Sequence, residues 1–129
     1  MCYTILNVME TKSKKILIID DSAFMRKVLR DIFESAGYSS FIEASNGREG
    51  IEKFKSEHPD FVFLDMIMPE VNGMDVLREI GKEAKIIVVS AVGQQEMITE
   101  AKSLGALDYV VKPFDRDQVL DKADHYLSA

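Results

Sequence analysis

Five short apolar runs alternate along this 129-residue chain with segments whose apolar residues recur at helical spacing. The runs lie at Lys15–Ile19, Ser39–Ala44 (the weakest), Phe61–Leu64, Lys85–Val89 and Leu107–Val111. One such run alone is ambiguous between a strand and a buried helical turn, but a continuous apolar run suits a strand that is buried on both faces. The alternation predicts an α/β fold: a doubly wound, (βα)5 parallel sheet with helices on both faces.

The segments between the runs carry helix start and stop signals. Ser22 opens the first helix, whose apolar residues follow the i, i+3, i+4 pattern of one buried face, and Gly37 ends it. Asn46 and Glu49 have the spacing of a capping box for the second helix. The remaining helices are expected over Met74–Ile80, over Met97–Leu104 with Gly105 after it, and from Asp115 to Ser128.

Residues 1–13 stand apart from this pattern. They have no basic start and are interrupted by Asn7 and Glu10, so they make a poor signal peptide. Met9 as the true start and a short edge strand are both open alternatives, but a loosely docked arm is expected, since chain ends usually are. Residues 14–129 are expected to form one domain of ordinary size.

Composition excludes several classes of function. The net charge of −6 argues against a general nucleic-acid surface. No window approaches the roughly 18 consecutive apolar residues of a membrane span, so no membrane insertion is expected. The single cysteine, Cys2, cannot form an internal disulfide, which fits a reducing, cytoplasmic setting. His58 and His125 are too few additional ligands for zinc.

Polar residues gather where the strong runs end. Right-handed crossovers place the C-terminal ends of parallel strands at one edge of the sheet. Asp20, Asp21, Asp65, Ser90 and Lys112 should therefore meet there. Crowded carboxylates raise one another's pKa unless a cation intervenes, and a hard divalent ion such as Mg²⁺ prefers oxygen ligands. A nucleophile, a metal and a lysine are the parts that phosphoryl transfer needs.

Each of these residues is a weak indication by itself, and the prediction depends on their joint placement. Two other classes of α/β protein fit less well. A phosphatase of the haloacid dehalogenase kind needs a second acid two residues after its nucleophile, where this chain has Ile67. An FMN-binding flavodoxin should offer hydroxyls and amides to a phosphate, which Asp20 and Asp21 would repel.

Four segments together resemble the motif set of two-component receiver domains, in the proper order and over residues 14–129. They are Ile-Ile-Asp20-Asp21-Ser22, Leu-Asp65-Met-Ile-Met-Pro69, Val-Val-Ser90-Ala91 and Tyr109-Val-Val-Lys112-Pro113-Phe114. The resemblance implies a flavodoxin-like sheet with strand order 2-1-3-4-5. Within the family, residues 21–26 and 90–95 look most like stand-alone chemotaxis receivers of the CheY type.

The resemblance also implies a role for each site residue. Asp65 would be the phosphoacceptor, and Lys112 would contact the phosphoryl group ahead of a cis bond to Pro113. Asp21 and Asp65 would bind Mg²⁺ directly, Asp20 through water, and Ile67 through its backbone carbonyl. Ser90 would move toward the phosphoryl group and Tyr109 would turn inward, so that both act as the switch.

The implied function is that of a cytoplasmic, monomeric, single-domain response regulator. It would not be an enzyme in the usual sense, but would assist its own Mg²⁺-dependent phosphorylation and dephosphorylation. The chain stops soon after the last helix, so no attached output domain is expected. The expected partners are a CheA-type histidine kinase, a phosphatase, and a flagellar motor switch or adaptor protein. The alternative, left open by the sequence, is a phosphorelay intermediate that passes phosphate to a histidine phosphotransfer protein.

Two residues that should flank the phosphoryl group support a further hypothesis. Ile67 lies two residues after Asp65, and Val92 lies two residues after Ser90. Neither aliphatic side chain can orient a water molecule, and both would hinder its approach. The phosphorylated form is therefore expected to hydrolyse slowly by itself and to depend on the phosphatase.

Overall fold

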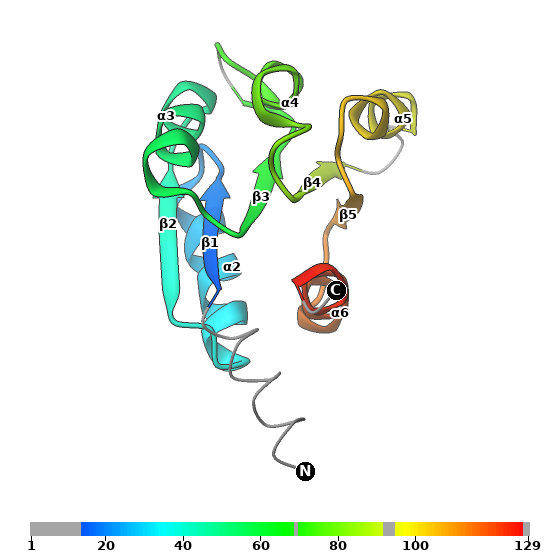
Figure 1. Ribbon diagram of the computed structural model, residues 1–129. Helices are drawn as coiled ribbons and strands as arrows, with labels where there is room; N and C mark the ends of the chain where they lie inside the picture. Colours follow the sequence, from blue (N-terminus) through cyan, green and yellow to red (C-terminus); the bar gives the residue numbers. More distant parts are fainter. Residues whose placement is uncertain (1–13, 69, 92–94, 128–129) are drawn as a thin grey trace.

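The strands form one parallel sheet in the order β2-β1-β3-β4-β5 (Figure 1), which confirms the predicted fold class and topology. The computed structural model describes residues 14–68, 70–91 and 95–127. The strands are β1 Lys15–Ile19, β2 Ser40–Ala44, β3 Phe61–Asp65, β4 Ile86–Ala91 and β5 Asp108–Lys112. The proposed arm at residues 1–13 lies outside the described residues.

Two strands reach further toward the C-terminal edge than the apolar runs predicted. β4 continues through Ser90 to Ala91, and β5 begins at Asp108 and includes Lys112. The reason is pairing, because Ser90 aligns with Val111, and Ala91 with Lys112, in the β4–β5 ladder. A ladder continues as long as backbone groups find partners, whatever the polarity of the side chains. Ser90 and Lys112 are therefore held by the sheet itself.

The helices are α2 Ala23–Ser35, α3 Gly47–Glu57, α4 Gly73–Ile80, α5 Gln95–Ser103 and α6 Arg116–Leu127. Ser22 caps α2 by accepting a hydrogen bond from the Met25 N–H at 3.2 Å. Asp115 and Gln118 exchange reciprocal backbone-to-side-chain hydrogen bonds at the start of α6, as their spacing predicted. The last predicted residue of α6, Ser128, lies outside the described part of the chain.

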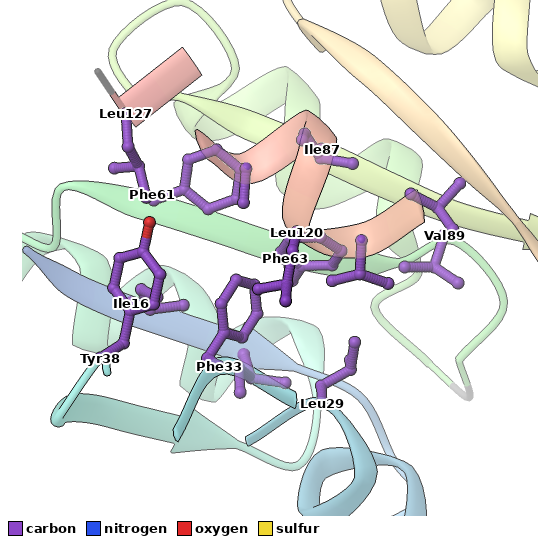
Figure 2. Close-up of a cluster of buried hydrophobic side chains, with 14 residues drawn as sticks. Ile16, Leu29, Phe33, Tyr38, Phe61, Phe63, Ile87, Val89, Leu120 and Leu127 are labelled. Carbon is purple, nitrogen blue, oxygen red and sulfur yellow. The ribbon is translucent and has the colours of Figure 1, made fainter. Parts of the chain in front are cut away.

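One face of the sheet packs against α2 and α6 through an aromatic cluster (Figure 2). The rings of Phe33 and Phe63 lie 5.4 Å apart, and those of Phe33 and Tyr38 lie 5.6 Å apart, both in edge-to-face geometry. The Tyr38 hydroxyl donates a hydrogen bond to Asp124 of α6. Burial, together with this carboxylate, raises the pKa of Tyr38 above its usual value. The cluster fixes both helices against β1 and β3.

The other face packs against α3, α4 and α5, which Figure 1 shows on the opposite side of the sheet from α2 and α6. α4 and α5 end close together: a Cβ added at Gly105, whose φ is 117°, would lie 2.3 Å from the carbonyl oxygen of Gly81. Glycine is needed there both for the backbone angle and for the space. In the described ranges, no helix is long and apolar enough to cross a membrane.

Candidate functional site

Three carboxylates meet at the C-terminal edge of the sheet, as predicted. Asp20 and Asp21 follow β1, and Asp65 is the last residue of β3. One carboxylate oxygen from each lies within 4.8 Å of the others. Asp20 and Asp65 are only 2% and 6% exposed, whereas Asp21 is open to solvent. This arrangement of oxygen donors could hold a hard divalent cation.

The surroundings disfavour negative charge on the two buried acids. Burial raises the pKa of Asp20, against a hydrogen bond at 2.9 Å from the Ser22 N–H that lowers it. Burial likewise raises the pKa of Asp65, and here the opposing hydrogen bond comes from the Ile67 N–H at 3.2 Å. A bound cation would lower both pKa values, because it stabilises the ionised forms.

Lys112, the last residue of β5, brings a positive charge to Asp20 and Asp65. Its Nζ lies 3.7 Å from Oδ2 of Asp65 and 3.9 Å from Oδ2 of Asp20. The side chain is about one-third exposed, so the ammonium group is also open to a molecule that enters from solvent. The bond between Lys112 and Pro113 is cis, as the family resemblance implied.

Ser90 has a buried hydroxyl with an unused hydrogen-bonding capacity. It is 2% exposed, and its Oγ is the single buried side-chain oxygen or nitrogen without a hydrogen-bond partner among the described residues. Buried polar groups are nearly always paired, so an orphaned hydroxyl needs an explanation. Ser90 lies in β4, which pairs with β3, and its preceding residue Val89 aligns with Asp65, so the hydroxyl belongs to a strand end next to that of Asp65.

Tyr109 is half-buried in β5 and lies between two lysines. The Nζ atoms of Lys102 and Lys122 are 5.2 Å and 4.6 Å from the centre of its ring. Lys122 also donates hydrogen bonds to Asp108 and to the Tyr109 backbone carbonyl. Tyr109 aligns with Val88 in the β4–β5 ladder, two residues before Ser90, so Ser90 and the Val88–Tyr109 pair belong to the same face of the sheet.

Two exposed apolar residues lie close to residues of the site, and one of them, Phe24, was not among the residues predicted from the sequence. Ile67 was predicted both as a ligand through its carbonyl and as an aliphatic side chain that flanks the phosphoryl group, and the residue is 54% exposed, two positions after Asp65. Phe24 is 73% exposed and lines a shallow cleft with Met25, Val28, Lys112, Pro113 and Phe114. Phe24 could have been noticed in the sequence, because it departs from the buried periodicity of its helix.

The chain matches the model of the response regulator receiver domain over residues 16–124. The chemotaxis protein CheY of Thermotoga maritima is 52% identical over 84% of this chain and 92% of its own length. The Bacillus subtilis CheY is 44% identical over 88% of this chain and 98% of its own length. A chain in the crystal structure of the CheX–CheY–BeF3–Mg²⁺ complex from Borrelia burgdorferi superposes with a TM-score of 0.82, at 35% identity and 88% coverage of both chains.

Proposed function

Because this chain belongs to the response regulator receiver family and is closely related to CheY, we propose that Asp65 accepts a phosphoryl group from the phosphohistidine of a histidine kinase. The observation that carries the proposal is the environment of the Asp65 carboxylate. It is buried at a strand end, 3.7 Å from the Lys112 ammonium and within a cluster of three acids.

In the reaction, an oxygen of Asp65 attacks the phosphorus of the phosphoimidazole. An O–P bond forms, the N–P bond breaks, and its electron pair returns to the imidazole nitrogen of the kinase. Asp21 and Asp65 would hold Mg²⁺ directly, Asp20 through water, and the Ile67 carbonyl would complete the protein's ligands. The bound ion would neutralise negative charge on the phosphoryl oxygens, which otherwise repel the acids.

Three further residues respond to the new acyl phosphate. Lys112 turns from the carboxylates to a phosphoryl oxygen, which carries more negative charge. The unpaired hydroxyl of Ser90 donates a hydrogen bond to another phosphoryl oxygen. Tyr109 then moves inward on the same face of the sheet, which shifts the population of surface conformations around α5, β5 and α6.

The downstream role that fits best is a cytoplasmic, monomeric chemotaxis messenger. It would take its phosphoryl group from a CheA-type kinase and carry it to a flagellar motor switch or adaptor protein, and a phosphatase would end the signal. Transfer onward to a histidine phosphotransfer protein is less favoured, since both curated relatives compared above are chemotaxis proteins. The chemistry at Asp65 is the same in either role.

The proposal is tested by incubating the protein with acetyl phosphate, with and without Mg²⁺, and measuring its intact mass. We expect a gain of one phosphoryl group that requires Mg²⁺ and that maps to Asp65 after digestion. Two controls report nonspecific acylation by acetyl phosphate. One is a sample quenched in acid, and the other is unfolded protein. No gain in mass by the folded protein, with Mg²⁺ present, would contradict phosphoacceptor function and leave a receiver that acts by binding alone.

Substituting Ile67 with asparagine is expected to accelerate loss of the phosphoryl group roughly tenfold, which corresponds to about 1.4 kcal/mol in the barrier. The amide can orient an attacking water, whereas the exposed isoleucine side chain excludes it. The measurement is the decay of phosphorylated protein after acetyl phosphate is removed. Val92, the other residue in this hypothesis, lies outside the described residues.

Leu107→Asn is the matched control for this substitution. Leu107 is also a partly exposed aliphatic residue, 38% by area, but it precedes β5 at the end of the strand away from the acids. Its replacement should leave the decay rate unchanged. An unchanged rate in Ile67→Asn as well would contradict the idea that this side chain protects the acyl phosphate.

A further inference from the structure

We infer that Arg26 is a positioning residue for the cation site, because it fixes the peptide group that joins Asp20 to Asp21. This inference rests on the proposed function, since it concerns how the chain presents two acids to Mg²⁺. Arg26 touches none of the reacting atoms. Its effect would reach the cation through the backbone of the turn between β1 and α2.

The Arg26 side chain makes two hydrogen bonds from one planar group. Its Nη1 donates to the backbone carbonyl of Asp20 at 2.7 Å, and its Nε donates to Oε1 of Glu43 at 3.0 Å. The side chain is only 16% exposed, so water competes weakly for these bonds. Guanidinium donors have a fixed geometry, and this pair therefore holds the turn after β1 at a set position relative to β2.

The carbonyl that accepts the hydrogen bond from Arg26 belongs to the peptide group directly before Asp21. The peptide between Asp20 and Asp21 is planar, so fixing the direction of its C=O also fixes its N–H and the start of the next residue. The Asp21 carboxylate itself receives no hydrogen bond from any described residue, and it is exposed. Without such a hydrogen bond to hold it, the backbone on which this carboxylate is mounted sets the position from which it can reach a cation.

The far end of this link is anchored on β2. Glu43 also accepts a hydrogen bond from Nη1 of Arg30 at 3.2 Å, and its backbone carbonyl accepts one from Lys53. The next residue, Ala44, accepts the N–H of Asp20 at 3.1 Å. Both the N–H and the C=O of Asp20 are thus tied to the end of β2, one directly and one through Arg26.

Arg30 provides a matched control. It is the next arginine along the same face of α2, it pairs with the same carboxylate, and it does not touch the turn that carries the acids. Substituting either arginine with methionine removes one positive charge and one ion pair with Glu43. Only Arg26→Met loses the hydrogen bond to the Asp20 carbonyl. Arg30→Met instead loses the ion pair with Glu34 and the contact with the Phe41 ring, both away from the turn.

Loss of the Arg26 charge and loss of its positioning contact would change the Mg²⁺ affinity in opposite directions. Removing a positive charge near a cation site should strengthen cation binding, or leave it unchanged where solvent screens the charge. Loss of a positioning contact should weaken it, and outer-shell contacts of metal ligands are worth about 10- to 100-fold in affinity. We therefore expect Arg26→Met to weaken Mg²⁺ binding about tenfold and Arg30→Met to bind at least as tightly as the unsubstituted protein.

The experiment is calorimetric titration of each protein with Mg²⁺ in the absence of any phosphodonor, with thermal unfolding measured alongside. Arg26→Lys keeps the charge but cannot hold both acceptors with one planar fork, so it should recover only part of the affinity. Equal affinities in Arg26→Met and Arg30→Met, or tighter binding by Arg26→Met, would overturn the inference while leaving the site intact. Absence of binding by the unsubstituted protein would instead overturn the proposed Mg²⁺ site, and this inference with it.

Discussion

Replacing Asp65 with asparagine is expected to abolish phosphoryl uptake from acetyl phosphate and to make the folded protein more stable. The amide has nearly the shape of the carboxylate, and its oxygen can still accept the hydrogen bond from the Ile67 N–H. It cannot act as the nucleophile, however, because its oxygen carries no full negative charge. Intact-mass measurement after treatment with acetyl phosphate and Mg²⁺ should show no added phosphoryl group.

The gain in stability follows from the direction of the Asp65 pKa. Burial raises this pKa above its usual 3.8, more than the Ile67 N–H and Lys112 lower it. A carboxyl whose pKa is higher in the folded than in the unfolded state stabilises the fold at low pH, and this stabilisation is lost as pH rises through the folded pKa. At neutral pH the ionised Asp65 therefore costs stability, which asparagine avoids.

Thermal unfolding at two pH values tests this explanation. At pH 7 without Mg²⁺, Asp65→Asn should be more stable by about 1 kcal/mol, a typical gain when a strained functional group is removed. Near pH 4 the difference should shrink, since Asp65 is then increasingly protonated in the unsubstituted protein. A variant that is less stable than the unsubstituted protein at pH 7 would show that pairing with Lys112 outweighs burial.

Asp117→Asn is the control for both measurements. Asp117 lies in the first turn of α6 with its side chain 85% exposed, so its loss should change neither phosphoryl uptake nor stability appreciably. If Asp65→Asn still gained a phosphoryl group, the acceptor would be another residue, with the exposed Asp21 the first to examine.

The sequence was sufficient to predict which strand ends converge. Asp20, Asp65 and Lys112 follow three separate apolar runs, and parallel connectivity leaves their strands one common edge. The order of the strands could not be predicted in this way, because apolar runs do not indicate which strands pair. That order came from the family resemblance and is confirmed by the β1–β2 and β1–β3 ladders.

The sequence contains no pattern that predicts contacts between side chains and distant backbone groups. Arg26 belongs to a segment that contributed to the family resemblance, but no contact of its side chain was predicted, and its guanidinium donates to the Asp20 carbonyl. Lys122 likewise donates to the carbonyl of Tyr109, 13 residues before it. Backbone acceptors are present at every position, so residue types cannot reveal which one a long side chain will reach. The unpaired hydroxyl of Ser90 could also be recognised only in the structure, because whether a buried hydroxyl has a hydrogen-bond partner depends on all of its neighbours.

Truncating Phe63 to alanine is expected to produce the largest loss of stability, about 3–5 kcal/mol, as for other buried phenylalanines. Phe63 is 1% exposed in the central strand β3, and its ring lies 5.4 Å from that of Phe33 and 5.5 Å from that of Phe61 (Figure 2). The deletion removes the contact between β3 and α2 at the centre of the aromatic cluster. Domains of this size are typically stable by about 5–15 kcal/mol, so much of the total would be lost.

Urea unfolding measures this loss, and Phe24→Ala provides the matched control. Phe24 undergoes the same chemical deletion, but its side chain is 73% exposed and should cost less than about 0.5 kcal/mol. Similar losses in the two variants would mean that the cluster closes around the missing ring at little cost.

Phe63 lies two residues before Asp65 on the same face of β3. If the strand instead keeps a cavity, we expect phosphoryl uptake to persist as long as the sheet stays folded, because β1 and β4 hold β3 through its backbone on both sides.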